Sequence, residues 1–325
     1  MSSPVPIAVT SRSFSSHSTL RAELLERYTN VRFNEEGIRL TDETLLKFAR
    51  GRRKLITALE KIDEPVLLAL PELEVVSKFG VGTDMLDMSA LARHGVRLGW
   101  SGGVNRRSVA ELALALMLAQ LRHIPTQTRE VEEGKWKSLR GRELSGSTIG
   151  VIGCGHIGKD LIRLLGPFEC RILAHDIVDF PDFYAQHSVE PVALEVLLGR
   201  ADVVTLHVPL DGHTRGMLNR DRLALLKPAA ILINTARGGL IDEKALATML
   251  REGRLGGAAF DVFGNEPPGN HELLGLPNFC ATPHIGGSSE EAVLAMGRAA
   301  IRGLDENELP RLGQHGEIGR NDSRA

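Results

Sequence analysis

The chain has 325 residues, of which 42% are hydrophobic and 25% charged, as in a globular protein long enough for two domains. With 41 acidic and 39 basic side chains it carries a net charge of −2, which argues against nucleic acid or a membrane surface as a partner. Three cysteines provide neither a disulfide framework nor a metal pair, and the start of the chain has no secretory signal pattern, so we expect a cytoplasmic protein without a metal site.

The first hundred residues alternate short apolar runs with amphipathic stretches, which is the pattern of an α/β fold. Helical patterns cover Leu20–Tyr28 and Asp42–Ala49. The predicted strands are Ile7–Thr10, Val31–Phe33, Leu55–Ala58, Val75–Phe79 and Val96–Leu98.

A helix predicted at Arg107–Leu121 is apolar nearly all round, so we expect it to be buried in a core or against another subunit. Its apolar part is too short to span a bilayer. A polar stretch, Glu130–Ser145, separates it from a second α/β series. The predicted strands of that series are Thr148–Ile152, Arg171–His175, Val203–His207, Ala230–Asn234, Ala258–Val262 and Phe279–Ala281. Six strands with crossovers between them predict a doubly wound parallel sheet.

Two helix starts can be placed from their caps. Asp242 is the expected N-cap of a helix from Glu243 to Glu252. Ser288 and Glu291 have the spacing of a capping box and are expected to open the last long helix, Ser288–Leu304. The polar tail from Pro310 to Ala325 is expected to be mobile.

A glycine motif follows the first strand of the second series. Gly153-Cys-Gly155-His-Ile-Gly158 has the spacing G-x-G-x-x-G. The first glycine permits a tight turn, the second lets the backbone approach a pyrophosphate, and the third lets the next helix pack against the strand. The amide groups at the start of that helix, together with its dipole, favour phosphate.

Asp176 ends the next strand, at the place where an acidic side chain receives the ribose hydroxyls of a dinucleotide. A carboxylate there repels the 2′-phosphate of NADP, so the pattern favours NAD. The same stretch nearly matches the nucleotide-hydrolase motif G-x-x-x-x-G-K-[ST], but Asp160 stands where a hydroxyl is needed for Mg²⁺. The dinucleotide interpretation is therefore preferred.

Three side chains that can perform proton chemistry follow successive strands of the second series. Arg237, Glu266 and His284 each come shortly after an apolar run, and the carboxyl ends of parallel strands share one edge of a sheet. A protonated His can donate to the oxygen of a 2-keto acid, Glu can stabilise the imidazolium, and Arg can bind the substrate carboxylate. Singly, each could equally be a salt-bridging, turn or surface residue.

At these residues the sequence resembles the D-isomer-specific 2-hydroxyacid dehydrogenase family. The resemblance runs from about Lys54 to Leu304. It is carried by four stretches: Lys78 to Asp87, the glycine motif with Asp176, Asn234 to Glu243, and Asp261 to His284. Within the family the chain is most similar to the 3-phosphoglycerate dehydrogenases.

The resemblance implies two Rossmann-like, doubly wound parallel-sheet domains with a cleft between them. Residues 1–101 and 286–325 would form a flavodoxin-like substrate domain, and residues 102–285 an NAD-binding domain. It further implies a homodimer, formed largely through the cofactor domain and the helix at Val109–Leu121.

The resemblance also implies roles for individual residues. The catalytic triad would be Arg237, Glu266 and His284, with Asp261 bonded to the nicotinamide carboxamide. His207 is interpreted as part of the lining of the cofactor pocket. The predicted NAD site comprises Gly153, Gly155, His156, Ile157, Gly158, Asp176, His207, Val208, Pro209, Thr214, Thr235, Ala236, Arg237, Asp261, His284 and Gly286. The predicted substrate contacts are Lys78, Val81, Gly82, Arg237 and His284.

The substrate is expected to be a 2-hydroxy or 2-keto acid with a distal anionic group, as in 3-phosphoglycerate. The loop Thr57-Ala-Leu-Glu-Lys61 lacks the arginines that such enzymes place there, although Lys61, Lys78, Arg106 and Arg107 offer other cations. Glyoxylate or hydroxypyruvate reduction and the oxidation of phosphite or a phosphonate remain alternatives. A protein that senses NAD(H) without catalysis is the alternative from another class.

Overall fold

The computed structural model describes residues 2–269 and 272–310, so the predicted mobile tail, apart from Pro310, lies outside the described residues. The chain divides into two compact units. The first comprises the residues up to Asn105 and those from Ser289 on, and the second comprises Arg106–Ser288.

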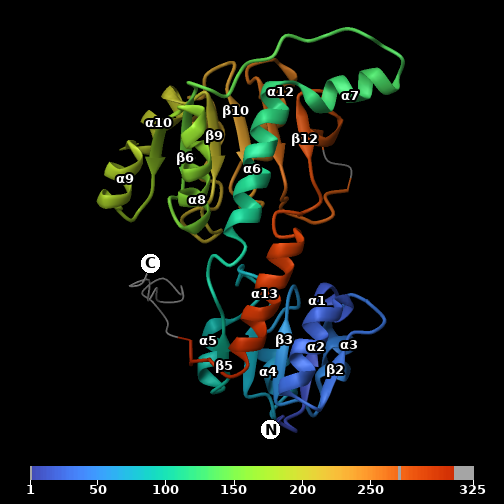
Figure 1. Ribbon diagram of the computed structural model, residues 1–325. Helices are drawn as coiled ribbons and strands as arrows, with labels where there is room; N and C mark the ends of the chain where they lie inside the picture. Colours follow the sequence, from blue (N-terminus) through green and yellow to red (C-terminus); the bar gives the residue numbers. More distant parts are fainter. Residues whose placement is uncertain (1, 270–271, 311–325) are drawn as a thin grey trace. The chain divides into compact units, whose positions relative to one another are not determined.

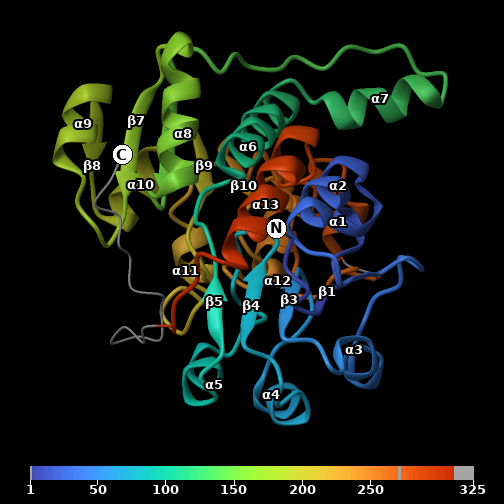
Figure 2. The same ribbon diagram turned by 60° about the horizontal axis from the view of Figure 1, so that its bottom comes forward.

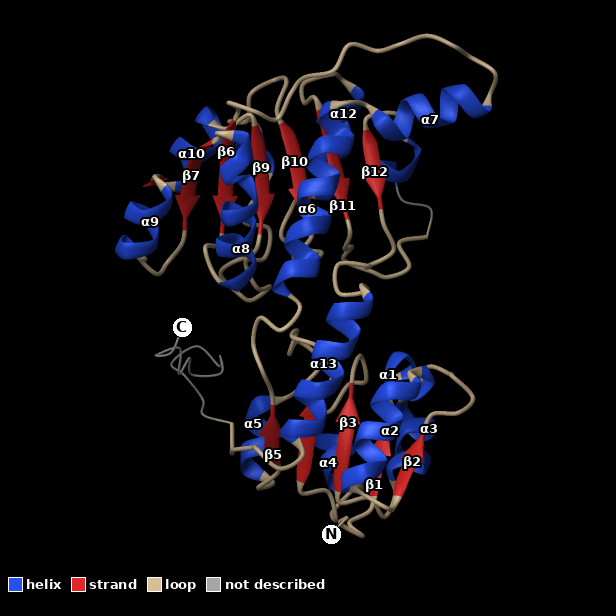
Figure 3. Cartoon of the chain, in the orientation of Figure 1, coloured by secondary structure: helices blue, strands red, loops and turns tan. Residues whose placement is uncertain are grey.

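The first unit is built on a five-stranded parallel sheet in the order β2-β1-β3-β4-β5 (Figure 3). This is the flavodoxin-like order, in which the chain changes direction across the sheet between β1 and β3. The strands are β1 (Ile7–Val9), β2 (Val31–Phe33), β3 (Lys54–Thr57), β4 (Val75–Lys78) and β5 (Arg97–Gly99).

Alternate residues of these strands face two separate cores, because successive side chains in a strand point to opposite faces. Ile7, Val9 and Ile56 belong to one core, whereas Ala8 and Leu55 belong to the other. The first core is covered by α1 (Arg12–Ser16), α2 (Ser18–Arg27) and α13 (Glu290–Gly303). The second is covered by α3 (Asp42–Ala49), α4 (Glu64–Ala69) and α5 (Met88–Arg93).

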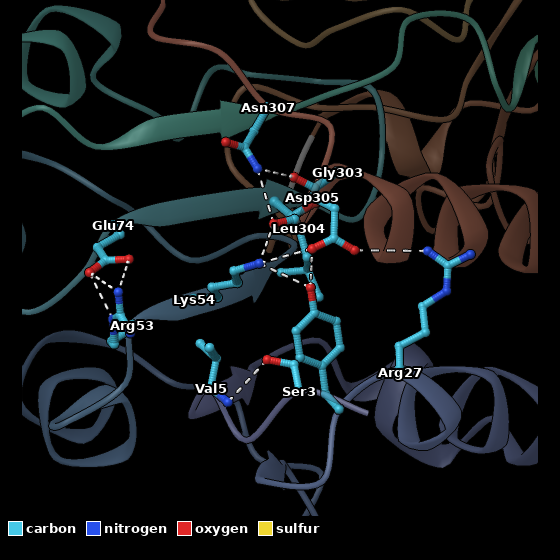
Figure 4. A network of polar contacts seen from close by, with 12 residues as sticks. Ser3, Val5, Arg27, Arg53, Lys54, Glu74, Gly303, Leu304, Asp305 and Asn307 are labelled. Atoms are coloured by element: carbon cyan, nitrogen blue, oxygen red, sulfur yellow. Dashed lines mark hydrogen bonds and ion pairs between the residues drawn. The ribbon is translucent and has the colours of Figure 1, made fainter. Parts of the chain in front are cut away.

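A polar network anchors the end of α13 at the start of β3 (Figure 4). The Lys54 ammonium donates to the Leu304 carbonyl at 2.6 Å and to the Asp305 carboxylate at 3.0 Å, and the Tyr28 hydroxyl also donates to Asp305. Burial and the Asp305 carboxylate raise the pKa of Tyr28. Burial by itself would raise the pKa of Asp305, but the hydrogen bonds from Tyr28 and Lys54 hold it below its ordinary value. The last helix is thus tied to the first unit by charge-assisted bonds as well as by its apolar face.

The second unit is built on a seven-stranded parallel sheet in the order β12-β11-β10-β9-β6-β7-β8 (Figure 1). The direction of winding changes between β6 and β9. The strands are β6 (Thr148–Ile152), β7 (Arg171–His175), β8 (Val189–Pro191), β9 (Val203–Leu206), β10 (Ile231–Asn234), β11 (Gly257–Phe260) and β12 (Phe279–Ala281).

Helices cover both faces of this sheet. One face packs against α6 (Arg106–Leu121) and α8 (His156–Leu165), which Figure 1 shows lying across the strands. The other face packs against α10 (Leu194–Arg200), α11 (Arg220–Leu223) and α12 (Glu243–Arg251). The helix α9 (Pro181–His187) contributes Tyr184 to the same core as α6 and α8. The structure confirms the predicted α/β class with two doubly wound parallel sheets.

One helix of the second unit stands away from its sheet. It is α7 (Ile124–Glu132), which has no buried residue, and a long loop leads from it back to β6 (Figure 2). The sequence analysis did not predict this helix, because a helix without buried residues carries no apolar stripe facing a core. Among the described residues, no helix is long and apolar enough to cross a membrane.

Two further features differ from the sequence-based expectation. The strand β8 was not predicted, because only Val189 of its three residues is buried and Pro191 stands at the sheet edge. The cap of α13 is Ser289, which accepts from the Ala292 amide at 3.1 Å. The prediction of Ser288 was wrong by one residue, because the Ser288 amide still closes a turn onto the Ile285 carbonyl.

Candidate active site

The residues predicted to carry chemistry in the second unit lie at one edge of its sheet. Because all seven strands are parallel, their carboxyl ends meet along that edge. From β12 toward β7, the side chains that follow successive strands are His284, Asp261 with Glu266, Arg237, His207, the glycine motif and Asp176. The glycine motif follows β6, next to the point where the winding changes direction, which is the usual ligand position in open α/β sheets.

The glycine motif is a tight loop that packs against β9 and leads into α8. Gly153 has a φ of 93°, and a Cβ there would lie 2.7 Å from the carbonyl carbon of His207. A Cβ on Gly158 would lie 2.1 Å from the Gly153 carbonyl oxygen. At both positions a side chain would force backbone segments apart. The first and third glycines therefore have the roles that the sequence predicts.

The middle glycine faces open space. A Cβ on Gly155 would have no neighbour within 4 Å, and Gly155 is the N-cap of α8 without a side-chain hydrogen bond to the first turn. His156 and Ile157 form that first turn. A helix start that lacks a side-chain cap and is open to solvent at Gly155 suits a pyrophosphate.

Asp176 lies beside the glycine motif, at the end of β7. One carboxylate oxygen accepts from the Cys154 amide at 2.6 Å, and the other accepts from the Val178 amide at 2.9 Å. These bonds fix the orientation of the carboxylate, which still has lone pairs for further donors. Its place next to the glycine motif fits the ribose role predicted for it.

His207 follows β9, and its environment keeps the imidazole neutral. Its Nε2 lies 3.0 Å from the Thr205 hydroxyl, whereas its buried Nδ1 has no hydrogen-bond partner in the structure. Burial lowers the pKa of His207 to about 3. A permanently neutral imidazole cannot supply protons near neutral pH, in keeping with a lining role.

The predicted cofactor residues Val208, Pro209 and Thr214 follow His207 in the loop after β9. Val208 packs where a Cβ on Gly153 would lie. The Thr214 hydroxyl bonds back to the Pro209 carbonyl at 2.7 Å and receives the Asp211 amide at 2.8 Å, which closes the loop after β9.

Arg237 is held by the backbone of the loop after β10. Its guanidinium donates to the Ala236 carbonyl at 2.7 Å. Asn234, which is fully buried, donates to the Arg237 carbonyl at 2.8 Å and accepts from the Ala236 amide at 3.1 Å. Thr235, directly after β10, is buried, and its hydroxyl has no hydrogen-bond partner in the structure. This hydroxyl therefore remains available both to donate and to accept a hydrogen bond. The two hydrogen bonds of the Asn234 side chain therefore stabilise the conformation of the loop that carries Arg237.

Glu266 and His284 form a hydrogen-bonded pair. The carboxylate lies 2.7 Å from Nδ1 of the imidazole, and its other oxygen accepts from the Phe263 amide at 3.0 Å. Both side chains remain more than a third exposed. With Nδ1 turned to the carboxylate, Nε2 is the nitrogen left for a reacting group, which is the arrangement of a general acid and base with an orienting partner.

Asp261 fixes the loop that carries His284. Its carboxylate accepts from the Thr282 hydroxyl at 2.5 Å and from the amides of Ile285 and Gly286, each at 2.8 Å. The His284 backbone has a φ of 56°, a conformation that non-glycine residues adopt at a cost. Three donors on one buried carboxylate compensate that cost and set the position of the imidazole.

A close backbone contact joins the loops of Arg237 and Glu266. A Cβ on Gly238 would lie 1.9 Å from the carbonyl carbon of Phe263. Only glycine permits this approach, which brings the loops after β10 and β11 together. Sequence analysis did not identify Gly238 or Asn234 as site residues. The sequence signals that could have found them are an asparagine at the end of a predicted strand and a glycine pair directly after Arg237.

The predicted substrate residues of the first unit lie at the corresponding edge of its own sheet. Lys78 is the last residue of β4, and its ammonium donates to the Ala58 carbonyl and, at 3.3 Å, to the Phe79 carbonyl. Val81 and Gly82 follow in the next loop, where the Trp100 indole donates to the Val81 carbonyl at 2.9 Å.

Two of the cations considered for a distal anion are engaged elsewhere. Lys61 pairs with Asp63 at 2.7 Å, a hydrogen bond that raises the pKa of Lys61. Arg107 pairs with Asp160 of α8 at 2.9 Å. Among the described residues, no group of three or more His, Cys, Asp or Glu side chains could hold a metal ion.

The sequence was compared with known families and proteins. Residues 114–286 match the family described as D-isomer specific 2-hydroxyacid dehydrogenase, NAD binding domain. The chain is 40% identical to D-3-phosphoglycerate dehydrogenase of Methanocaldococcus jannaschii over 79% of its length, and spans only 50% of that protein. It is 37% identical to hydroxypyruvate reductase of Thermotoga maritima, over 83% of this chain and 90% of that protein.

Solved structures give the same result. A D-isomer specific 2-hydroxyacid dehydrogenase from a Polaromonas species superposes with a TM-score of 0.85 at 30% identity, covering 93% of this chain and 96% of that one. D-lactate dehydrogenase from Aquifex aeolicus, solved with NAD and lactic acid, superposes with a TM-score of 0.79 over 91% and 93% of the two chains. At 24% identity the second likeness supports the fold alone.

Proposed function

Because the chain belongs to the D-isomer specific 2-hydroxyacid dehydrogenase family, we propose that it transfers a hydride between NAD and a D-2-hydroxy acid or the corresponding 2-keto acid. The observation that carries the proposal is the 2.7 Å pair of Glu266 and His284. Glu266 follows β11, the neighbour of the strand that leads to Arg237, and His284 follows β12, the next strand along the sheet.

NAD fits the residues of the second unit. Three features lie at the carboxyl ends of β6, β9 and β10. They are the open space beside Gly155 at the uncapped start of α8, and the unpartnered polar atoms of His207 and of Thr235. When bound, the nicotinamide supplies or accepts the hydride. The chain would bind the pyrophosphate at the glycine motif and the adenosine ribose at Asp176, whose charge disfavours NADP.

His284 is the proposed general acid and base. In the direction of reduction, its Nε2 would donate a proton to the substrate oxygen as negative charge develops there, and in oxidation it would remove that proton. Glu266 stabilises the imidazolium and holds the ring with Nε2 turned outward. Asp261 and the Thr282 hydroxyl keep the loop in place.

Arg237 is the proposed electrophilic and binding residue. A guanidinium offers two parallel donors to a planar carboxylate and can also polarise a carbonyl oxygen. The backbone around Val81 and Gly82 and the ammonium of Lys78 are proposed to bind the substrate carboxylate from the first unit. We therefore assign residues 1–101 and 286–325 to the substrate and residues 102–285 to the cofactor.

A distal anionic group on the substrate, as in 3-phosphoglycerate, was the sequence-based prediction, with glyoxylate or hydroxypyruvate and phosphite or phosphonates as alternatives. The relatives that the chain matches include a D-3-phosphoglycerate dehydrogenase, a hydroxypyruvate reductase and a glyoxylate reductase, which supports a small 2-keto acid. These substrates differ in the group at the end of the molecule far from the carboxylate, and the assay must determine which group the protein accepts.

We also propose that the protein is a cytoplasmic homodimer. The helix α7 and the segment after it expose Ile124, Val131 and Trp136, the last at 91% of its surface. Large apolar side chains exposed close together on an arm without buried helical residues are typical of a subunit interface. Sedimentation velocity of the wild type and of Trp136→Ser with Val131→Ser tests the proposal, which requires the variant to dissociate at concentrations where the wild type is dimeric.

The test of the function is the consumption of NADH by the purified protein with a panel of 2-keto acids. The panel contains glyoxylate, hydroxypyruvate, 3-phosphohydroxypyruvate and pyruvate, with phosphite and NAD in a separate reaction. The proposal requires turnover of at least one 2-keto acid, with NADPH used less efficiently than NADH. Tight NADH binding without turnover of any member would instead support a protein that senses the cofactor.

A further inference from the structure

A carboxylate of the chain occupies the crevice of the first unit where a ligand of a doubly wound sheet usually binds. In the order β2-β1-β3-β4-β5, that crevice lies beyond the carboxyl ends of β1 and β3, where the direction of winding changes. Thr10 follows β1, and Ala58 follows β3. Glu60 lies in the loop after β3 and reaches back to both strand ends.

Three donors converge on one oxygen of Glu60. Its Oε2 accepts from the Thr10 hydroxyl at 2.7 Å, the Thr57 hydroxyl at 2.9 Å and the Ala58 amide at 2.8 Å. Both threonines are fully buried. Two hydroxyls and an amide around one oxygen form a small anion-binding nest, and the protein fills this nest with its own charge.

The nest lies beside the residues proposed to bind the substrate carboxylate. Strands β3 and β4 are parallel neighbours in which Thr57 pairs with Lys78. The Lys78 ammonium donates to the carbonyl of Ala58, the residue whose amide contacts Glu60. The loop after β4, with Val81 and Gly82, starts from the same edge. The Glu60 loop and the loop after β4 therefore start from neighbouring strand ends at one edge of the sheet.

We propose that Glu60 determines specificity by excluding a second anionic group from the substrate. The inference rests on the proposed function and narrows its substrate class to 2-keto acids whose far end is short and uncharged, or carries a hydroxyl that can donate to the carboxylate. A phosphate at the same place would meet a like charge, and the three donors that could hydrogen-bond to it already bind Glu60. Lys61, the cation of the loop Thr57-Ala-Leu-Glu-Lys61, is paired with Asp63.

The test is the ratio of kcat/KM for 3-phosphohydroxypyruvate to that for hydroxypyruvate, measured for the wild type and for Glu60→Gln. Glutamine keeps an oxygen acceptor for the three donors and removes the charge. The expected result is a ratio at least tenfold higher in the variant. Glu74→Gln is the matched control, because it removes an exposed carboxylate of the same unit that pairs with Arg53 before β3; its ratio should stay that of the wild type.

A purely structural role for Glu60 gives a different outcome. If the carboxylate only ties the strand ends together, Glu60→Gln lowers kcat/KM for both substrates by the same factor, and the unchanged ratio overturns the proposal. Inhibition of the wild type tests it without a variant, because D-glycerate should inhibit at least tenfold more strongly than 3-phosphoglycerate. Equal or stronger inhibition by 3-phosphoglycerate overturns it. Failure of the wild type to reduce any 2-keto acid would instead contradict the proposed function.

Discussion

Replacement of Gly238 by alanine tests whether the contact between two loops sets the geometry of the site. The Cβ of alanine would lie 1.9 Å from the carbonyl carbon of Phe263, whereas ordinary contact begins near 3.4 Å. The loops after β10 and β11 must therefore separate by about 1.5 Å, since the neighbouring atoms belong to the backbone and cannot rotate away. Arg237 is on one of these loops and Glu266 on the other.

The expected cost follows from that displacement. A misplacement of about 1 Å in a catalytic constellation lowers rates by about a hundredfold, which corresponds to about 2.7 kcal/mol of transition-state stabilisation. We expect kcat/KM for the best 2-keto acid to fall by about this factor in Gly238→Ala, measured by NADH consumption. Circular dichroism and the thermal midpoint show whether the variant is folded under the conditions of the assay.

Gly264→Ala is the matched control. Gly264 follows Phe263 in the same chain segment, but a Cβ there would meet nothing within 4 Å. Its kcat/KM should stay within a factor of two or three of the wild type, the range of an alanine substitution without contacts. A folded Gly238→Ala variant with the kcat/KM of the wild type would refute the reasoning, because it would show that Arg237 and Glu266 do not depend on this contact.

Three other substitutions test separate parts of the site. His284→Ala should abolish most turnover and leave the dissociation constant of NADH nearly unchanged, as measured by fluorescence titration; an equal loss of NADH affinity would contradict its action on the substrate oxygen. Asp176→Ala should reduce the ratio of kcat/KM with NADH to kcat/KM with NADPH. An unchanged ratio would mean that another residue contacts the ribose hydroxyls and sets the preference. His207 has a pKa of about 3 in the folded chain and an ordinary value near 6.5 when unfolded, so below pH 6.5 only the unfolded chain binds this proton. The free energy of unfolding should fall by about 1.4 kcal/mol per pH unit from this group as the pH drops toward 4. Urea unfolding of His207→Gln should show that much less pH dependence, and an identical slope would argue against a buried neutral imidazole.

The sequence determined the elements in which apolar residues alternate with turn signals. The strands Val31–Phe33, Thr148–Ile152, Arg171–His175 and Phe279–Ala281 have the predicted bounds. The N-cap Asp242 was also predicted correctly. These features are local, since burial of alternate side chains and capping by a neighbouring carboxylate are written within a few residues. The parallel order of the strands followed from the crossovers between them.

The sequence was also sufficient to predict that the proposed catalytic residues lie at one edge of the sheet, because each follows a strand of one parallel sheet. Distances and supporting contacts needed the tertiary structure. Glu266 and His284 form a pair although they follow different strands. The three donors to Asp261 come from a loop more than twenty residues away in the chain. The space beside Gly238 is limited by the separate loop that contains Phe263.

Glu60 is a second example of a residue whose type is known from the sequence but whose contacts are decided by the tertiary structure. In the sequence it is a charged residue in a loop without arginine, and the nearby lysines favoured a distal anion. The fold places Thr10, forty-six residues from Ile56 in the chain, next to the end of β3, and so closes three donors around the Glu60 carboxylate. Local sequence determines which residues can carry charge, whereas the pairing of β1 with β3 decides where that charge is held, because only tertiary contacts bring donors from distant segments together.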